Sequence, residues 1–154
     1  MLDAAHLSNV EQAAAFTALV AGFLGQAGLP ADDRFATGMK RRRGVLGDEW
    51  VERANARRTP FNAEFQDLIT RYAWGEIWTR PGLDEVTRRL LVVAMTASLS
   101  RWEEFDLHVA AALGAGVSTE AIKEVLLQTA IYAGVPAANT GFARAGAVIA
   151  KAAG

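Results

Sequence analysis

Three side chains with complementary chemistry stand at helical spacing in the second half of the chain. Arg101, Glu104 and His108 occupy positions i, i+3 and i+7 of a segment that contains no glycine or proline. On an α-helix these positions share one face, so a guanidinium, a carboxylate and an imidazole would lie together. Such a set can bind an anion and move a proton. The chain has no cysteine, which excludes disulfide and thiol-peroxide chemistry at this stripe.

Each of these residues also has a plainer interpretation. Glu104 and Arg101 can form an ordinary salt bridge on a helix surface, and His108 can be a core histidine with its hydrogen bonds satisfied. The other histidine, His6, is about a hundred residues away in the sequence, so a histidine-based metal site is not expected. We therefore predict no metal site.

Composition narrows the class of protein. The 154 residues are 51% hydrophobic and 21% charged, with a net charge of −1, which fits one globular domain that is not attracted to nucleic acid or membranes. The local exception is the basic run 40–43, which is either a salt-bridged helix end or an anion-steering patch. No signal peptide or membrane-spanning run is evident, and we expect a cytoplasmic protein.

Nearly every segment has the composition of a helix, with abundant alanine and no alternation of β-branched and polar residues. The first helices are expected at about 8–25, from 32 or 33 to the basic run, and at about 49–56 and 59–79. A helix from 84 to 99 should continue, directly or after a slight kink, to about 114. The last two helices are expected at about 118–133 and from the break at 134–136 to about 151. Thr59-Pro60, Asp84 and Ser118 are predicted starts. We expect a compact all-α bundle of about seven to eight helices.

The apolar helices bear on how the chain packs, within one subunit and between subunits. Residues 90–99 are apolar nearly all round, which predicts a central buried helix. The last two helices carry broad faces of small apolar residues, which can either complete the core of one subunit or pack against another.

From about 38 to 150 the chain resembles the 4-carboxymuconolactone decarboxylases. The resemblance rests on RRGVLGD at 42–48, TPFNAEFQ at 59–66, ITRYAWGEIW at 69–78, RWEEF with its following histidine at 101–108, and EVLLQ and IYAGVPAAN within 124–139. It implies an all-α fold shared with alkyl hydroperoxidase D-like proteins. It also implies a homo-oligomer, commonly a trimer or hexamer, and a cofactor-free decarboxylation in protocatechuate breakdown.

The wider superfamily often carries a Cys-x-x-Cys pair, a histidine four residues later and a glutamate twelve residues before the first cysteine. In this chain those positions are Arg101, Glu104, His108 and Arg89. The differences remove peroxidase activity and leave polar groups suited to an anionic substrate.

Residues 1–30 form a separate region in this interpretation, with 31–154 as the decarboxylase domain. The sequence around His6 resembles the C-terminal end of 3-oxoadipate enol-lactone hydrolases, which are α/β-hydrolases with this histidine as the triad base. The other triad members would precede it and are not in this sequence, so His6 cannot perform that chemistry here. We expect the chain to derive from a hydrolase–decarboxylase fusion, the alternative being a chance match in a helical extension.

The implied substrate, 4-carboxymuconolactone, is an unsaturated lactone with two carboxylates. Loss of CO₂ would give a dienolate that is then protonated at carbon. Arginine binds carboxylates bidentately, and Arg101, Arg89 and Arg71 are our candidates. His108, with its pKa raised by Glu104, would deliver the proton, and His108, Tyr132 or Trp74 would stabilise the oxyanion. The alternative function is a non-catalytic oligomerisation module of the fusion.

Overall fold

The computed structural model describes residues 31–153, and every regular element within them is helical. The predicted all-α class is confirmed, with seven α-helices and one π-helix in the described part of the chain. The elements are α3 (Ala31–Leu46), α4 (Asp48–Ala56), α5 (Ala63–Ile69), the π-helix η1 (Thr70–Ile77), α6 (Glu85–Ser98), α7 (Trp102–Gly114), α8 (Thr119–Tyr132) and α9 (Val135–Ala153). The separate origin expected for residues 1–30 lies outside the described residues.

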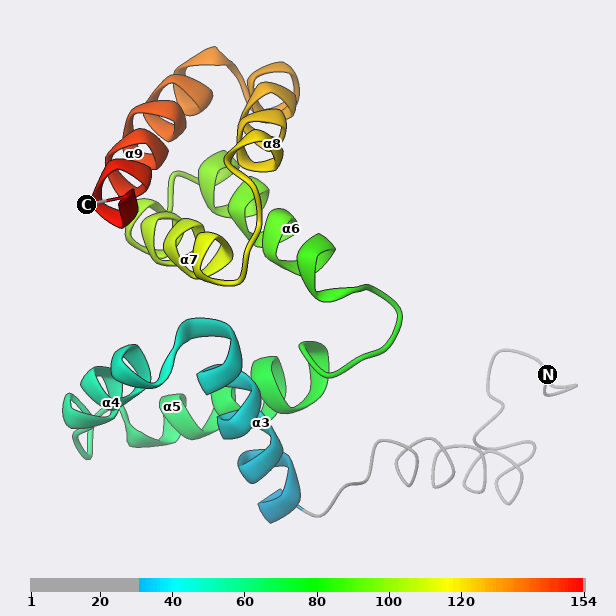
Figure 1. Ribbon diagram of the computed structural model, residues 1–154. Coiled ribbons are helices and arrows are strands. Elements are labelled where there is room, and N and C mark those ends of the chain that lie inside the picture. Colours follow the sequence, from blue (N-terminus) through cyan, green and yellow to red (C-terminus); the bar gives the residue numbers. More distant parts are fainter. Residues whose placement is uncertain (1–30, 154) are drawn as a thin grey trace, which may run out of the picture.

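The helices form two groups, with α3, α4, α5 and η1 on one side and α6–α9 on the other (Figure 1). A loop between η1 and α6 joins the groups. In the first group α3 packs along η1, and in the second each helix contacts at least two others. The groups meet where α3 contacts α7, so residues on these two helices and on the end of η1 face the junction.

The hydrophobic core lies within the second group. Phe105 and Val109 of α7 are fully buried, and they belong to one cluster with residues of α6, α8 and α9. Two predicted N-caps are present at the starts of α6 and α8. The Asp84 carboxylate accepts from the Thr87 backbone N–H at 2.9 Å, and the Ser118 hydroxyl accepts from the Ala121 N–H at 3.1 Å. These caps satisfy N–H groups that the helix cannot pair internally.

The first group depends on a backbone contact between α3 and η1. A Cβ atom on Gly38 would lie 2.0 Å from the Thr70 carbonyl oxygen, and one on Gly75 would lie 2.4 Å from the Arg34 carbonyl oxygen. Both obstacles are backbone atoms, which cannot rotate away. Glycine at these two positions therefore allows the helices to cross at a distance that no side chain permits.

Some predicted boundaries were wrong. The helix expected to start at Thr59-Pro60 starts at Ala63, because the Asn62 side chain accepts from the Thr59 N–H at 2.8 Å and closes a turn there. The break expected from Gly44 occurs only at Gly47, whose φ of 86° ends the preceding helix. The segment 70–77 is a π-helix rather than an α-helix, with the Trp78 N–H bonded to the Ala73 carbonyl.

The prediction of a central helix buried on all sides was also wrong. Within α6, Val93 and Ala97 are fully buried, but Met95 is 56% exposed, and the C-cap residue Leu99 is 68% exposed. One face of α6 therefore packs on the core while the opposite face remains uncovered in a single chain. Within residues 31–153, none of the helices combines the length and apolar character that a bilayer crossing requires.

The glycine crossing predicts a contrast within α3. Gly38→Ala should destabilise the fold by about 3 kcal/mol or more, because the added methyl group meets a carbonyl oxygen of η1. Gly44→Ala on the same helix meets no atom within 4 Å and should stabilise by about 0.5–1 kcal/mol through helix propensity. Urea unfolding of both variants checks this, and equal stabilities would contradict the crossing.

Candidate active site

His108 lies on α7 and faces the end of η1. Its ring stacks on Trp78, with the ring centroids 6.4 Å apart and the planes at 11°. Trp78 in turn stacks on Trp74, with centroids 5.1 Å apart and an interplanar angle of 24°. The three rings form a continuous stack from the first helix group to the second, because Trp74 and the C-cap residue Trp78 are four residues apart and so share one face of the helix.

The environment of His108 keeps its imidazole neutral. The Nδ1 atom is buried and has no hydrogen-bond partner among the described residues. The pKa of His108 is lowered from 6.5 to about 4, chiefly by burial of the ring and also by the Arg89 charge, while the Glu104 charge opposes both effects. Glu104 therefore acts in the expected direction, but the desolvation of the ring outweighs it.

The three residues of the sequence stripe do not share one helix face. Arg101 precedes α7 as its N-cap residue, with φ −88° and ψ 74°, because Ser100 adopts a left-handed conformation with φ 55° and turns the chain there. Glu104 and His108 stand one turn apart within α7. The side chains of Arg101 and Glu104 are exposed and form no salt bridge within residues 31–153, so the plain helix salt bridge between them is not formed.

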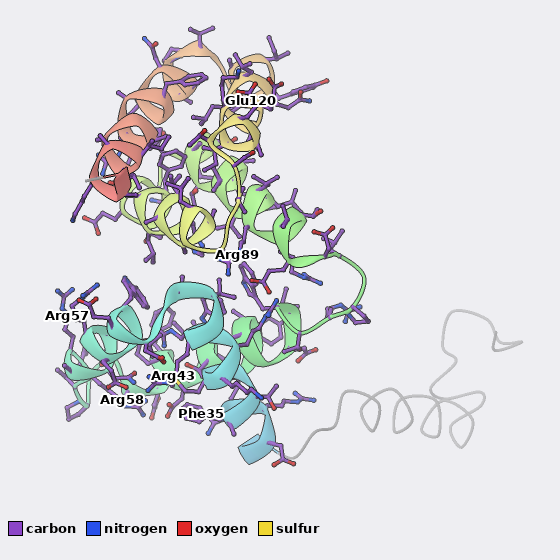
Figure 2. All side chains as sticks on the ribbon, viewed as in Figure 1. Phe35, Arg43, Arg57, Arg58, Arg89 and Glu120 are labelled. Carbon is purple, nitrogen blue, oxygen red and sulfur yellow. The ribbon has the colours of Figure 1, made fainter. Side chains whose placement is uncertain are left out.

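Arg89 is buried at the junction between the two helix groups, with its side chain 3% exposed (Figure 2). Its Nε and Nη2 atoms donate to Glu85 at 3.1 and 2.7 Å. Its Nη1 atom donates to the Val45 and Ala111 carbonyls, both at 3.0 Å. All three nitrogens are thus engaged by α3, α6 and α7, which differs from the free guanidinium that we expected for substrate.

A second arginine completes this network and was not assigned from the sequence. Arg41 of α3 forms a salt bridge with Glu85 at 2.9 Å and donates from Nε to the Trp78 carbonyl at 3.2 Å. Its Cζ atom lies 6.0 Å from the centroid of the Trp78 ring. The basic run 40–43 was the available signal, but the sequence could not show which of its members faces the junction.

Arg71 and Tyr132 lie elsewhere. Arg71 lines a cavity of about 490 Å³ with Arg34, Glu64, Asp67, Leu68, Tyr72 and Glu76, on the side of η1 that packs against α5 and the start of α3. Tyr132 is 81% exposed and lines an apolar cavity of about 340 Å³ between α6 and α8. His108 lines neither of these cavities.

The structure thus brings together His108, Glu104, Arg89 and, through the ring stack, Trp74. A neutral imidazole beside a cationic network can donate a hydrogen bond to a developing oxyanion, and a nearby anion would favour its protonation. Among residues 31–153 no group of three or more His, Asp and Glu side chains could hold a metal ion.

Comparisons with known proteins place the chain among decarboxylases. The profile of the carboxymuconolactone decarboxylase family matches residues 63–147. The 4-carboxymuconolactone decarboxylase of Acinetobacter baylyi is 40% identical over 108 residues, which are 70% of this chain and 81% of that protein. The nitrosuccinic acid decarboxylase of Metarhizium robertsii is 43% identical over 102 residues, 66% of this chain and 71% of that protein.

A third, shorter relative has a higher percentage identity over a shorter stretch. A 4-carboxymuconolactone decarboxylase sequence of Pseudomonas putida is 49% identical over 43 residues, which are 28% of this chain and 90% of that sequence. Two of the three relatives are thus named for the same lactone, and all three are named decarboxylases.

The network around Arg89 predicts a structural cost. Arg89→Met should destabilise the fold by about 3 kcal/mol, because two carbonyls and Glu85 lose their donor at a buried site. Arg53→Met, which removes an exposed pair with Glu49, should cost under about 1 kcal/mol. Urea unfolding compares the two, and an Arg89→Met variant as stable as the unchanged protein would show that the network is dispensable.

The burial of His108 predicts a pH dependence of folding. Because the pKa of His108 is about 4 when folded and 6.5 when unfolded, the unfolded chain binds more protons between these values. The contribution of the neutral His108 to the free energy of unfolding should therefore be fully present above about pH 6.5. The free energy of unfolding should fall by about 3 kcal/mol as the pH is lowered to 4. His108→Gln should remove this part of the dependence in unfolding measured from pH 4 to 7. An identical pH profile in the variant would contradict the burial of the imidazole.

Proposed function

The chain belongs to the carboxymuconolactone decarboxylase family, and from that premise we propose that it decarboxylates 4-carboxymuconolactone to 3-oxoadipate enol-lactone without a cofactor. The observation that carries the proposal is the 40% identity to a 4-carboxymuconolactone decarboxylase over 81% of that protein. The matched family region also contains every residue of the junction on η1, α6 and α7.

The substrate supplies its own electron sink. The bond between the ring carbon and its carboxylate breaks, CO₂ leaves, and the electron pair moves through the double bond to the lactone carbonyl oxygen. The resulting dienolate takes up one proton at carbon and becomes the enol-lactone. The protein must therefore hold a dianion, stabilise an oxyanion and supply one proton, which requires no redox partner.

His108 is our candidate for the last two tasks. Its neutral ring can donate one hydrogen bond to the growing oxyanion, a contribution of about 3–4 kcal/mol when the donor is preorganised. A bound dianion would raise the pKa of His108 from its value of about 4 in the free chain. The substrate would thereby favour protonation of the group that returns the proton to carbon.

The arginines divide between two roles in this proposal. Arg101 is exposed at the start of α7, and its guanidinium would bind the carboxylate that stays on the product. Strong binding of the departing carboxylate would stabilise the ground state and slow the reaction. Arg89, with every nitrogen engaged, would position α7 and supply positive charge. Glu104 would orient His108 or Arg101.

The exposed apolar surface supports a homo-oligomer, with a trimer or hexamer implied by the family resemblance. Four large apolar side chains are each more than half exposed: Met95 of α6, Leu99 at the C-cap of α6, and Ile131 and Tyr132 of α8. Leu91 and Tyr132 also line the apolar cavity of about 340 Å³ between these two helices, and a large exposed apolar surface is typical of an interaction site. We propose that these faces pack against other subunits, which would cover the uncovered side of α6.

The second candidate function is a non-catalytic oligomerisation module. The same exposed faces favour it, and the resemblance of residues 1–30 to an enol-lactone hydrolase would make it the assembly part of a fusion. The distinguishing variant is Met95→Glu, which should dissociate the oligomer in sedimentation velocity. An active dissociated enzyme would show that assembly and catalysis are separate properties.

Turnover of fresh 4-carboxymuconolactone, followed by CO₂ release with a chelator present, tests the proposed function. His108→Ala should lower kcat by about 100-fold or more, because oxyanion stabilisation and proton delivery are both lost. Glu103→Ala, an exposed change on the same helix, should retain activity. Nitrosuccinic acid, the acid for which one relative is named, serves as the competing substrate.

The results separate the candidates. No turnover of either the lactone or nitrosuccinic acid by the assembled protein would reject decarboxylation and favour the scaffold. Faster turnover of nitrosuccinic acid than of the lactone would reject the proposed substrate while retaining the reaction class.

A further inference from the structure

An imidazole that takes part in catalysis is usually oriented by a hydrogen bond from its second nitrogen to a carboxylate or carbonyl. His108 lacks this support, since its Nδ1 atom is buried and has no hydrogen-bond partner among residues 31–153. The contact that the structure does provide is the Trp78 ring, nearly parallel to the imidazole at 11° and 6.4 Å away between centroids.

We propose that Trp78 is the positioning residue for His108 and that ring stacking replaces the missing hydrogen bond in orienting the imidazole. The proposal rests on the proposed decarboxylase function, because it concerns the same histidine. It assigns Trp78 no contact with the reacting atoms.

Trp78 is well placed for this role because it is held from several sides. Trp74, which is 8% exposed, stacks on its ring at 5.1 Å. Arg41 donates to its backbone carbonyl at 3.2 Å and is itself anchored by Glu85 at 2.9 Å. The glycine crossing of α3 and η1 fixes the elements that carry these residues. A ring supported in this way loses little freedom when the imidazole packs against it.

The stack also has an electrostatic consequence. The indole covers one side of the imidazole and contributes to the burial that lowers the pKa of His108 to about 4. Removing the indole would expose that side to water. The imidazolium would then be less unfavourable than it is in the unchanged protein, so the pKa of His108 would rise. The ring would also be free to turn.

The chain offers a matched control in Trp50. This tryptophan is also partly buried and also lies under an arginine, with the Arg42 Cζ atom 5.3 Å from its ring centroid. It belongs to α4 and forms no ring stack with His108. The general effects of losing an indole and a cation–π contact can therefore be separated from the effect on His108.

The experiment compares Trp78→Leu, Trp78→Phe and Trp50→Leu in the full chain. Steady-state kinetics on 4-carboxymuconolactone give kcat and KM, and NMR titration of the imidazole signals, assigned with His108→Gln, gives the pKa of His108. Trp78→Leu should lower kcat by about 10–100-fold with KM changed less than about threefold, since a misoriented group affects the reaction more than binding. The pKa of His108 should move from about 4 toward 6.5.

Trp78→Phe keeps an aromatic face and should recover most of both properties, while Trp50→Leu should change neither. The proposal is overturned if Trp78→Leu leaves kcat and the His108 titration unchanged, or if Trp50→Leu has the same effects. Should the unchanged protein have no activity on the lactone, the proposed function fails, and the titration alone still decides whether Trp78 controls His108. If Trp78→Leu does not fold, Trp78→Phe and Trp78→Met, compared by the same titration, decide the question.

Discussion

The buried guanidinium of Arg89 is the interaction on which the arrangement of the two helix groups depends. It joins the end of α3, through the Val45 carbonyl, to α7, through the Ala111 carbonyl, while Glu85 of its own helix balances its charge. Because a buried cation without partners is very costly, the three helices must keep this geometry. The same charge then acts on the imidazole of His108 one turn from Ala111.

The π-helix and the two glycines provide the second constraint. The contact of backbones at Gly38 and Gly75 lets η1 lie close along α3, and η1 carries Trp74 within it and Trp78 at its C-cap, where their rings stack. π-Helical turns are often found at functional sites. Here the turn carries an aromatic platform across the junction to α7, so a feature of the first helix group determines the environment of a residue in the second.

These constraints change the chemical interpretation of His108. A histidine with an ordinary pKa would be partly protonated near neutral pH, but burial keeps this one neutral until about pH 4. A neutral imidazole suits a site whose ligand brings two negative charges, because protonation becomes favourable only when the anion is present. The site without substrate would then contain no buried, unpaired imidazolium. When the substrate is bound, the same burial strengthens the attraction between the imidazolium and the anionic substrate.

The sequence by itself determined the all-α class, the caps at Asp84 and Ser118, and the family, because these depend on local hydrogen bonds, composition and residue order. It also identified His108 and Glu104 at helical spacing. Only the tertiary structure decided that Arg101 lies before α7 and that Arg89 is fully engaged. It also decided that Arg71 and Tyr132 line other cavities, that Trp78 stacks on the imidazole, and that Arg41 lies over the Trp78 ring. The physical reason is that burial and partner choice arise from helices distant in sequence, and spacing along one helix does not encode them.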